Sequence, residues 1–327
     1  MDMPESNITL PPVIAVDLGG TKLAVAVVDS QGNLVLKRRY PVEKRTPDDS
    51  IEQIISACLE ILRDTDLDTV KIAGMGMVVP GIFDRGSGLA WAPNLWGNDH
   101  IPLRDKLRSR LSCTIIIDSD RTGYVLGEQW RGVARGMVDV VYMAVGTGIG
   151  LVIITGGRVA RGAHGIAGAI GWFAVDPQKK VLYRQLGCLE SEAAGPALAR
   201  KAAERLAAGR PSMLHRPAGP SSQHLSTEQV VEAAHLGDRL ALEALEEVTG
   251  YLAMGVANVI SILNPQMVVL GGGLMHAADL VFEPLCRQVL DWAQPIAARK
   301  TRIELSQLGA DAGLLGAARL VYLEQNP

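Results

Sequence analysis

Three mostly apolar segments of this sequence each run directly into a glycine turn, and this arrangement limits the folds open to the chain. The segments are residues 13–16, 138–144 and 267–270, and runs of this kind indicate strands buried on both faces. Buried strands that alternate with helical patterns are typical of an α/β fold. The turns that follow these strands are Asp17-Leu18-Gly19-Gly20-Thr21, Gly146-Thr147-Gly148 and Gly271-Gly272-Gly273.

Glycine turns of this kind present backbone N–H groups that no side chain shields. Such groups suit a polyphosphate, because converging amide dipoles bind anions. Neither the lysine of a Walker loop nor a helix-opening GxGxxG accompanies these turns. We therefore expect turns from separate domains to close on a nucleotide, a geometry that suits phosphoryl transfer. The alternative is that each turn is an ordinary tight connection between strands.

Length and periodicity predict two domains. At about 150 residues per domain, the 327 residues correspond to two, and the strand–glycine turn–strand pattern of residues 13–29 recurs at 138–155. Residues 13–40 predict an antiparallel meander of three strands. Further strands are expected at 70–79, 113–117, 267–270 and 302–306, helices at 51–62, 103–111, 122–130, 227–234, 238–263, 280–292 and 312–322, and loops at 162–172 and 215–223.

Composition excludes several classes of protein. The net charge is −3, so no basic surface indicates nucleic acid or an anionic membrane as a partner. No segment approaches the ~18 consecutive apolar residues of a membrane span, and the acidic residues of the N-terminal segment argue against a signal peptide. Four cysteines far apart in the sequence predict free thiols in a cytoplasmic protein and no zinc site.

Seven motifs in a fixed order carry a resemblance to a known family. The chain resembles the ROK family (repressors, open reading frames and kinases) of the sugar kinase and actin-like ATPase superfamily from about residue 13 to its end. The motifs are DLGGTK at 17–22, VPG at 79–81, PNL at 93–95, the acid after strand 113–117, GTGIG at 146–150, GCLE at 187–190 and GGG at 271–273.

The resemblance implies two ribonuclease-H-like α/β domains of the actin and hexokinase type, with an interdomain cleft for ATP and a sugar. The smaller domain would comprise residues 1–121 together with 311–327, because the C-terminal helix of this family folds back onto the N-terminal domain. Residues 122–310 would form the larger domain.

Asp120 is the expected general base. It follows a strand, and an alcohol that attacks the γ-phosphate needs a base near its oxygen. The family motif is Asn-Asp before a helix, and this chain has Ser119 and Asp120 there. Two alternatives remain open: Asp120 caps the following helix, or Asp118 in the same turn is the base.

The resemblance implies ATP and Mg²⁺ as cofactors. Asp17 would hold Mg²⁺ through water, since this ion prefers hard oxygen ligands and keeps several waters; the alternative is a turn acid at a strand end. The glycines at 271–273 would approach the nucleoside. The phosphates would lie against Gly19, Gly20, Thr21, Lys22, Gly146, Thr147 and Gly148.

The acceptor is expected to contact Gly81, Asn94 and Glu190 in addition to Asp120. The family usually reads GEIGH where this chain has residues 168–172, so that Ala169 and Trp172 replace a sugar-binding Glu and a His. Each lost hydrogen bond to a hydroxyl costs about 0.5–1.5 kcal/mol, whereas Trp172 offers a surface for stacking on a ring.

We therefore expect a modified hexose, an amino sugar or a cyclitol-like polyol as acceptor. A cysteine cluster that follows GEIGH in the family is reduced to Cys188 within residues 186–188, which predicts no zinc.

Assembly and competing functions complete the expectations. A homodimer or homotetramer is implied by the resemblance. Twelve residues precede Val13, so we expect no DNA-binding segment like that of the family's repressors. The alternatives to a kinase are a catalytically impaired, effector-binding pseudokinase and an ATPase without an acceptor.

Overall fold

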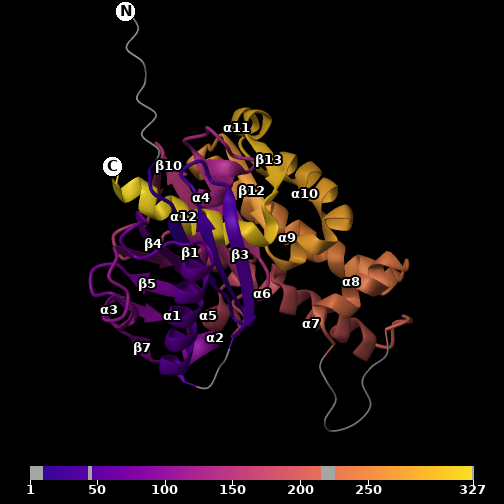
Figure 1. Cartoon of the computed structure of the whole chain (residues 1–327). Coiled ribbons are helices and arrows are strands. Elements are labelled where there is room, and N and C mark those ends of the chain that lie inside the picture. Colours follow the sequence, from indigo (N-terminus) through magenta and orange to yellow (C-terminus); the bar gives the residue numbers. More distant parts are fainter. Residues whose placement is uncertain (1–9, 43–45, 215–224, 326–327) are drawn as a thin grey trace, which may run out of the picture. The chain divides into compact units, whose positions relative to one another are not determined.

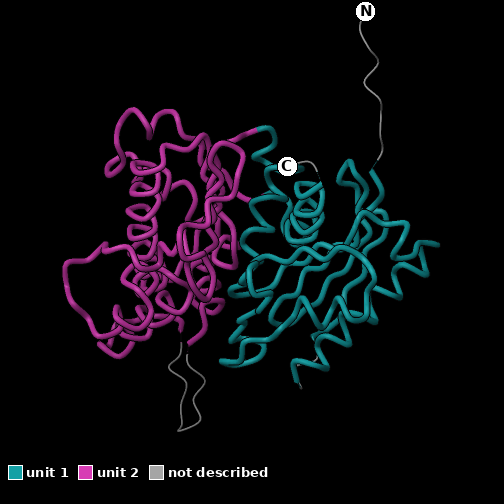
Figure 2. The backbone as a smooth tube through the Cα atoms, turned by 90° about the vertical axis from the view of Figure 1, so that its left-hand side faces the viewer, with its two compact units in different colours: residues 1–136, 307–327 teal, residues 137–306 magenta. Residues whose placement is uncertain are grey.

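The computed structural model describes residues 10–42, 46–214 and 225–325, so the loop predicted at 215–223 lies outside the described residues. The chain forms two compact units, 1–136 with 307–327 (unit 1) and 137–306 (unit 2), shown in separate colours in Figure 2. In the described ranges, no helix is both long and apolar enough to cross a bilayer. All four cysteines are free.

Unit 1 contains a five-stranded mixed sheet in the order β3-β2-β1-β4-β8. The first three strands form the predicted antiparallel meander, and β4 and β8 run parallel to β1. The carboxyl ends of β1, β4 and β8 therefore share one edge of the sheet, where the chemistry of open α/β sheets is found. The strands are β1 Val13–Leu18, β2 Lys22–Val28, β3 Leu34–Pro41, β4 Gly74–Val79 and β8 Ile115–Ser119.

Helices cover both faces of this sheet. Alternate residues of a strand face opposite sides, and Ile14, Val16 and Leu18 pack into a core with the apolar stripe of helix α1, Pro47–Asp64. Helices α4, Asp120–Arg131, and α12, Ala312–Gln325, pack on the other face (Figure 1). Unit 1 thus extends to residue 136, beyond the boundary expected at 121, because α4 packs against α12 in the same unit.

Glycines allow the backbone of helix α12 to contact the backbones of the sheet and of α4 directly. A Cβ added to Gly76 would lie 1.8 Å from the carbonyl oxygen of Ala317, and one on Gly316 would lie 1.8 Å from that of Gly123. Such distances exclude any side chain, so these helices and the sheet meet backbone to backbone.

The buried Glu128 on α4 fixes the chain near both crossings between the units. Its Oε1 accepts hydrogen bonds from the backbone N–H groups of Gln307 and Leu308, at 2.9 and 3.0 Å, and its Oε2 accepts one from Val133 at 3.0 Å. One carboxylate therefore satisfies amides on the segment that leaves unit 1 and on the segment that returns to it.

Several small elements of unit 1 differ from the expectations. The PNL motif expected in a loop begins a short helix, α2 Pro93–Trp96, because a proline at the first helical position favours helix formation. The strand expected at 70–79 begins only at Gly74. A three-stranded antiparallel sheet, β5 Ile82–Asp84, β6 Leu89–Trp91 and β7 His100–Ile101, was not expected, and helix α3 spans Leu103–Arg108.

Unit 2 repeats the mixed-sheet plan with the order β11-β10-β9-β12-β13. Strands β9 and β10 are antiparallel across the second glycine turn, and β12 and β13 run parallel to β9. Gly156 and Gly157, both at positive φ, make the predicted hairpin turn into β11. The strands are β9 Val140–Val145, β10 Ile149–Thr155, β11 Arg158–Ala160, β12 Met267–Gly271 and β13 Arg302–Leu305.

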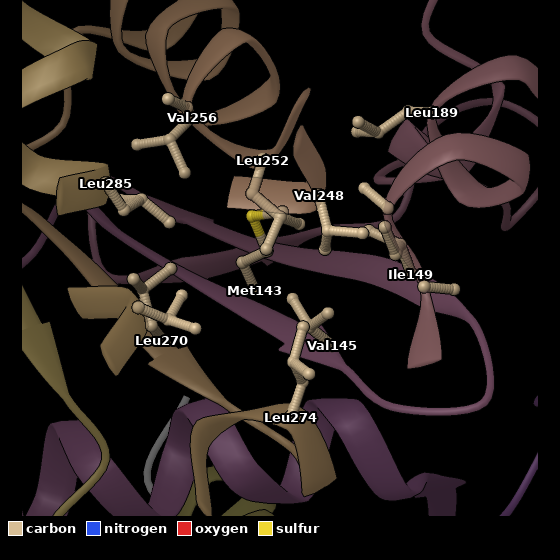
Figure 3. Packing of buried hydrophobic residues seen from close by; sticks show 14 of the residues in the cluster. Met143, Val145, Ile149, Leu189, Val248, Leu252, Val256, Leu270, Leu274 and Leu285 are labelled. Carbon is tan, nitrogen blue, oxygen red and sulfur yellow. The ribbon is translucent and has the colours of Figure 1, made fainter. Parts of the chain in front are cut away.

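The core of unit 2 forms around the long helix α9, Arg239–Leu263. Figure 3 shows Val248, Leu252 and Val256 of this helix packed with Met143 and Leu270 of the sheet. Except for α5, the remaining helices of unit 2 also supply residues to this core. These helices are α5 Tyr183–Leu186, which contributes none, α6 Cys188–Ala193, α7 Gly195–Ala207, α8 Thr227–His235, α10 Ala278–Trp292 and α11 Pro295–Lys300. Unit 2 also has 3₁₀ turns at Ile170–Trp172 and Gly273–Ala277, and unit 1 has one at Gly309–Asp311.

The glycine packing of α12 makes opposite predictions for two helical glycines. We expect Gly316→Ala to lower the free energy of unfolding by about 2 kcal/mol, because the clash with the Gly123 carbonyl outweighs the helix propensity of alanine. We expect Gly250→Ala in α9 to raise it by about 0.5–1 kcal/mol, since its new methyl meets only the flexible end of Gln288. Urea denaturation measures both, and equal effects would contradict the packing argument.

Candidate functional site

Asp17 lies in a row of residues that crosses the unit 1 sheet. In the strand registers Asp17 is opposite Ala24, which is opposite Arg39, and on its other side Asp17 is opposite Val78, which is opposite Asp118. This row lies at the carboxyl ends of the parallel strands β1, β4 and β8. An arginine and two carboxylates are thereby brought to one sheet edge from segments far apart in the sequence.

Asp120 is the first residue of helix α4, directly after β8. The N-cap of this helix is Ser119, whose Oγ accepts a hydrogen bond from the Thr122 N–H at 3.3 Å. Asp120 Oδ1 accepts one from the Arg121 N–H at 2.7 Å. The alternative that Asp120 caps the helix is therefore wrong, and the Asp120 carboxylate is not needed to cap the N-terminus of α4.

The pKa values of Asp17 and Asp120 are both raised by their surroundings. Burial, and next the negative charge of Asp120, raise the pKa of Asp17 to about 7, although the Arg39 charge acts in the opposite direction. Burial also raises the pKa of Asp120. Helix α12 contributes to the enclosure, since a Cβ added to Gly313 would lie 2.2 Å from Asp17 Oδ2. Carboxylates that repel each other in this way gain from a cation.

These carboxylates fit a magnesium site of the kind that nucleotide enzymes use. Mg²⁺ takes one or two carboxylates plus waters and phosphates instead of an all-protein cage. No group of three or more His, Cys, Asp or Glu side chains that could hold a metal ion occurs within residues 10–42, 46–214 and 225–325.

The first glycine turn, between β1 and β2, is closed by backbone hydrogen bonds. The Gly19 N–H donates to the Lys22 carbonyl at 2.8 Å, and the Val42 N–H donates to the Thr21 carbonyl at 3.0 Å. Thr21 and Lys22 are exposed, and a Cβ added to Gly20 would meet nothing within 4 Å. The turn is thus a stable loop with open space beside Gly20.

The second glycine turn, between β9 and β10, is supported by Glu190 of helix α6. Glu190 Oε2 accepts a hydrogen bond from the Ile149 N–H at 2.8 Å, and a Cβ added to Gly148 would lie 2.8 Å from the same oxygen. The Gly146 N–H donates to the Gly148 carbonyl at 3.0 Å. Glu190 therefore holds the turn that is predicted to bind phosphate, a role that its sequence motif did not reveal.

The third glycine turn lies beside the second, because β12 and β9 are parallel neighbours in unit 2. Gly272 has φ +93°, and a Cβ on it would lie 2.4 Å from the Val145 carbonyl oxygen. A Cβ on Gly146 would lie 3.7 Å from the Gly273 N–H nitrogen. Gly146 and Gly273 thus border one space.

That space belongs to a cavity of about 620 Å³ in unit 2, which we term the α8 cavity. One wall is a face of helix α8 and the other is the 3₁₀ turn 273–277. The residues that line it are Gly146, Thr147, Gly195, Pro196, Thr227, Glu228, Val231, Glu232, His235, Leu236, Gly273, Leu274, His276 and Ala277. Its size and its mixture of apolar and polar walls suit a small-molecule ligand.

The expected acceptor contacts are divided between the two units. Gly81, at φ +98°, lies against the Trp91 carbonyl, and Asn94 is exposed on α2. In unit 2, Ala169 and Trp172 are exposed, with 58% of the Trp172 surface accessible. Their contact with a sugar stays a prediction.

Comparison with known proteins places the chain in a family. The model of the ROK family matches residues 13–324. The chain belongs to the ROK family. Its fold is accordingly the two-domain, actin-like α/β fold of ROK hexokinases.

Both sequence relatives and solved structures cover almost the whole ROK chain. A glucokinase from Thermotoga maritima is 33% identical over 94% of this chain and 96% of its own length. The ROK hexokinase structure from Thermus thermophilus is 29% identical with a TM-score of 0.79, covering 96% of this chain and 99% of that one. A ROK glucokinase from Streptomyces griseus, in complex with glucose and AMPPNP, is 28% identical with a TM-score of 0.74 and coverages of 95% and 99%.

Two features of the chain differ from what its sequence predicted. The relatives do not bear out the interpretation of residues 186–188 as an altered zinc motif, and the lack of zinc stays a prediction. The wall that α8 contributes to the cavity was missed. Its only sequence signal is the spacing of Glu228, Val231, Glu232 and His235, which places them on one helix face.

The raised pKa of Asp17 predicts a pH-dependent gain in stability for Asp17→Asn. With a folded pKa of about 7 and an unfolded pKa of 3.8, the folded protein binds more protons between these values, so the parent loses stability as pH rises. We expect the variant to be more stable, and its advantage to be about 2 kcal/mol larger at pH 8 than at pH 5. Unfolding without added metal measures this.

The exposed Asp99 supplies the control for this experiment. Asp99→Asn removes the same charge, and we expect the same small effect at both pH values. An Asp17→Asn advantage that does not grow between pH 5 and pH 8 would contradict the proposed burial of charge.

Proposed function

We propose that this protein is an ATP-dependent phosphotransferase that phosphorylates a hydroxyl of a sugar or sugar-like polyol. The observation that carries the proposal is the pairing of Asp17 and Asp120 at the carboxyl edge of the unit 1 sheet, with mutual repulsion that a cation relieves. Membership of the ROK family supports the proposal, because the relatives similar to this chain include glucokinases.

ATP is proposed to bind with its nucleoside in the α8 cavity and its phosphates along the glycine turns. Gly146 and Gly273 line the cavity, a Cβ added to either would meet no side chain within 4 Å, and amides of this kind suit phosphate oxygens. The turn at residues 19–22 would contribute further phosphate contacts. The binding of AMPPNP to the Streptomyces griseus relative agrees with this proposal.

Asp17 is proposed to hold Mg²⁺ through water molecules. When bound, the ion supplies positive charge that offsets the charge of the phosphates. Asp17 and its neighbour Asp120 present the hard oxygen atoms that this ion prefers, and Arg39 in the same row of the sheet limits their net negative charge.

Asp120 is proposed to accept the proton of the acceptor hydroxyl. A general base works best when its pKa approaches the operating pH, and burial raises the pKa of this carboxyl. Asp118 is the weaker candidate: both acids accept a hydrogen bond from the next residue's N–H, but Asp118 is buried, whereas Asp120 is partly exposed.

The acceptor is proposed to be a modified hexose, an amino sugar or a cyclitol instead of glucose. Glucose is bound in the Streptomyces griseus relative, but this chain has Ala169 and Trp172 where the family pattern has a Glu and a His. Glu190 retains a carboxylate, but one of its oxygens supports the second glycine turn. Fewer polar groups thus remain for sugar hydroxyls, and Trp172 offers a stacking face.

A panel of acceptors tests this specificity. With ATP and Mg²⁺, we expect kcat/KM for the best modified hexose, amino sugar or cyclitol to exceed that for glucose about ten-fold or more, because two polar groups are missing from the sugar wall. Coupled measurement of ADP release gives the values. Turnover of glucose at an equal or higher rate would count against the proposed acceptor class, although not against kinase activity.

Asp120→Asn tests the proposed base. We expect kcat to fall about 10²–10⁴-fold, because the amide cannot accept the proton, while the Kd for ADP stays within about two-fold. The Asp118→Asn variant is the matched comparison and should retain most activity. A variant Asp120→Asn with near-parental kcat would remove Asp120 from the mechanism.

A catalytically impaired protein that binds a sugar effector is the second candidate. It is favoured by similarity to a putative xylose repressor from Caldicellulosiruptor, 29% identical over 97% of this chain and 79% of that protein. Absence of ADP release with every acceptor, combined with saturable sugar binding, would support it. Assembly as a homodimer or homotetramer stays a prediction.

A further inference from the structure

Glu232 is a carboxylate of the α8 cavity that nothing in the proposed reaction uses. It lies on α8, and its side chain makes no hydrogen bond or ion pair with another described residue. The other acid of the same face, Glu228, differs, because hydrogen bonds from its own backbone N–H and from the Ser226 side chain hold its pKa below the usual range. His235 is likewise engaged, with its Nε2 2.9 Å from Asp279 Oδ2.

The order of residues along α8 places Glu232 between two chemically different ends of the cavity. Thr227 lies at the phosphate end, since a Cβ on Gly195 would lie 3.1 Å from both Thr227 Oγ1 and the Gly146 carbonyl oxygen. Glu232 follows five residues later, about 7.5 Å along the helix axis. Leu236, the C-cap residue of α8, lies four residues beyond Glu232 and gives this end of the cavity an apolar side chain.

This sequence of phosphate turn, carboxylate and apolar end matches the order of parts in a nucleoside triphosphate. A carboxylate accepts hydrogen bonds from both hydroxyls of a ribose diol, and bonds to a charged acceptor are stronger than neutral ones. The same carboxylate repels an inorganic polyphosphate chain that continues from the phosphate turns into the cavity, because every unit of that chain is negative.

We propose that Glu232 binds the ribose diol of the donor and excludes inorganic polyphosphate, so that it sets the donor specificity of the α8 cavity. The inference rests on the proposed function, because it requires a nucleotide in this cavity. It assigns the donor class as ribonucleoside triphosphates, in preference to deoxyribonucleotides and to phosphate chains without a nucleoside.

Equilibrium binding to the full chain in the presence of Mg²⁺ tests the inference. The three kinds of probe are ADP, a deoxy analogue (2′-deoxy-ADP or 3′-deoxy-ADP) and tripolyphosphate. For the parent protein we expect ADP to bind about ten-fold more tightly than either deoxy analogue, the ratio that one charge-assisted hydrogen bond gives. For Glu232→Gln we expect that ratio to fall to about two, because a neutral acceptor binds more weakly, and tripolyphosphate to bind about three-fold more tightly.

Glu246→Gln is the matched control, since Glu246 is an exposed acid on α9 that does not line the α8 cavity. It should leave all three Kd values within about two-fold of the parent, because distant surface charges are screened. Equal affinity of the parent for ADP and its deoxy analogues, or unchanged discrimination in Glu232→Gln, would overturn the inference alone. A parent protein that binds no ADP would overturn the proposed function as well.

Discussion

The close packing of helix α12 on unit 1 is the constraint on which the acidic site depends. Glycines at Gly76, Gly123 and Gly316 allow backbone-to-backbone contact, and the same approach places Gly313 against the carboxylate of Asp17. Since α12 also packs on α4, the helix that begins at Asp120 is held by the same contacts. The last described segment of the chain thus lies against Asp17 and against the helix that begins at Asp120, both far from it in sequence.

This enclosure has an energetic cost that only a functional role explains well. Burial and the charge of Asp120 raise the pKa of Asp17, so near neutral pH the ionised Asp17 carries an energetic penalty in the folded protein that it does not carry in the unfolded chain. A carboxylate pair that destabilises its own fold is typical of sites that receive a cation or a proton. Arg39, opposite in the strand registers, offsets part of this charge, and its own Nη2 lies 3.2 Å from Asp311 Oδ1 at the start of α12.

Local sequence signals predicted much of the fold, and long-range register explains what they missed. The meander, the glycine turns and the long helix α9 follow from apolar runs and turn residues within a few positions of each other. The alignment of Arg39 with Asp17 depends on pairings across three strands, which no local pattern encodes. The short strands β5–β7 carry two or three residues each, too few for a period to emerge. The sequence did not predict the α8 cavity, because the polar residues of α8 have the spacing of an ordinary solvent-exposed helix face.

Glu190 shows why a motif can predict a residue but not the whole of its role. The resemblance assigns it to the sugar, whereas the hydrogen bond from the Ile149 N–H ties its Oε2 to the turn proposed to bind phosphate. A Cβ added to Gly148 or Gly171 would lie 2.8 or 3.0 Å from the same Oε2, so the absence of a side chain at both glycines makes room for this oxygen. Oε1 is then the oxygen left for the acceptor contact proposed above, and the exposed Ala169 and Trp172 would add few polar atoms to it. Under the proposed function, Glu190 would therefore link the support of this glycine turn to the choice of acceptor.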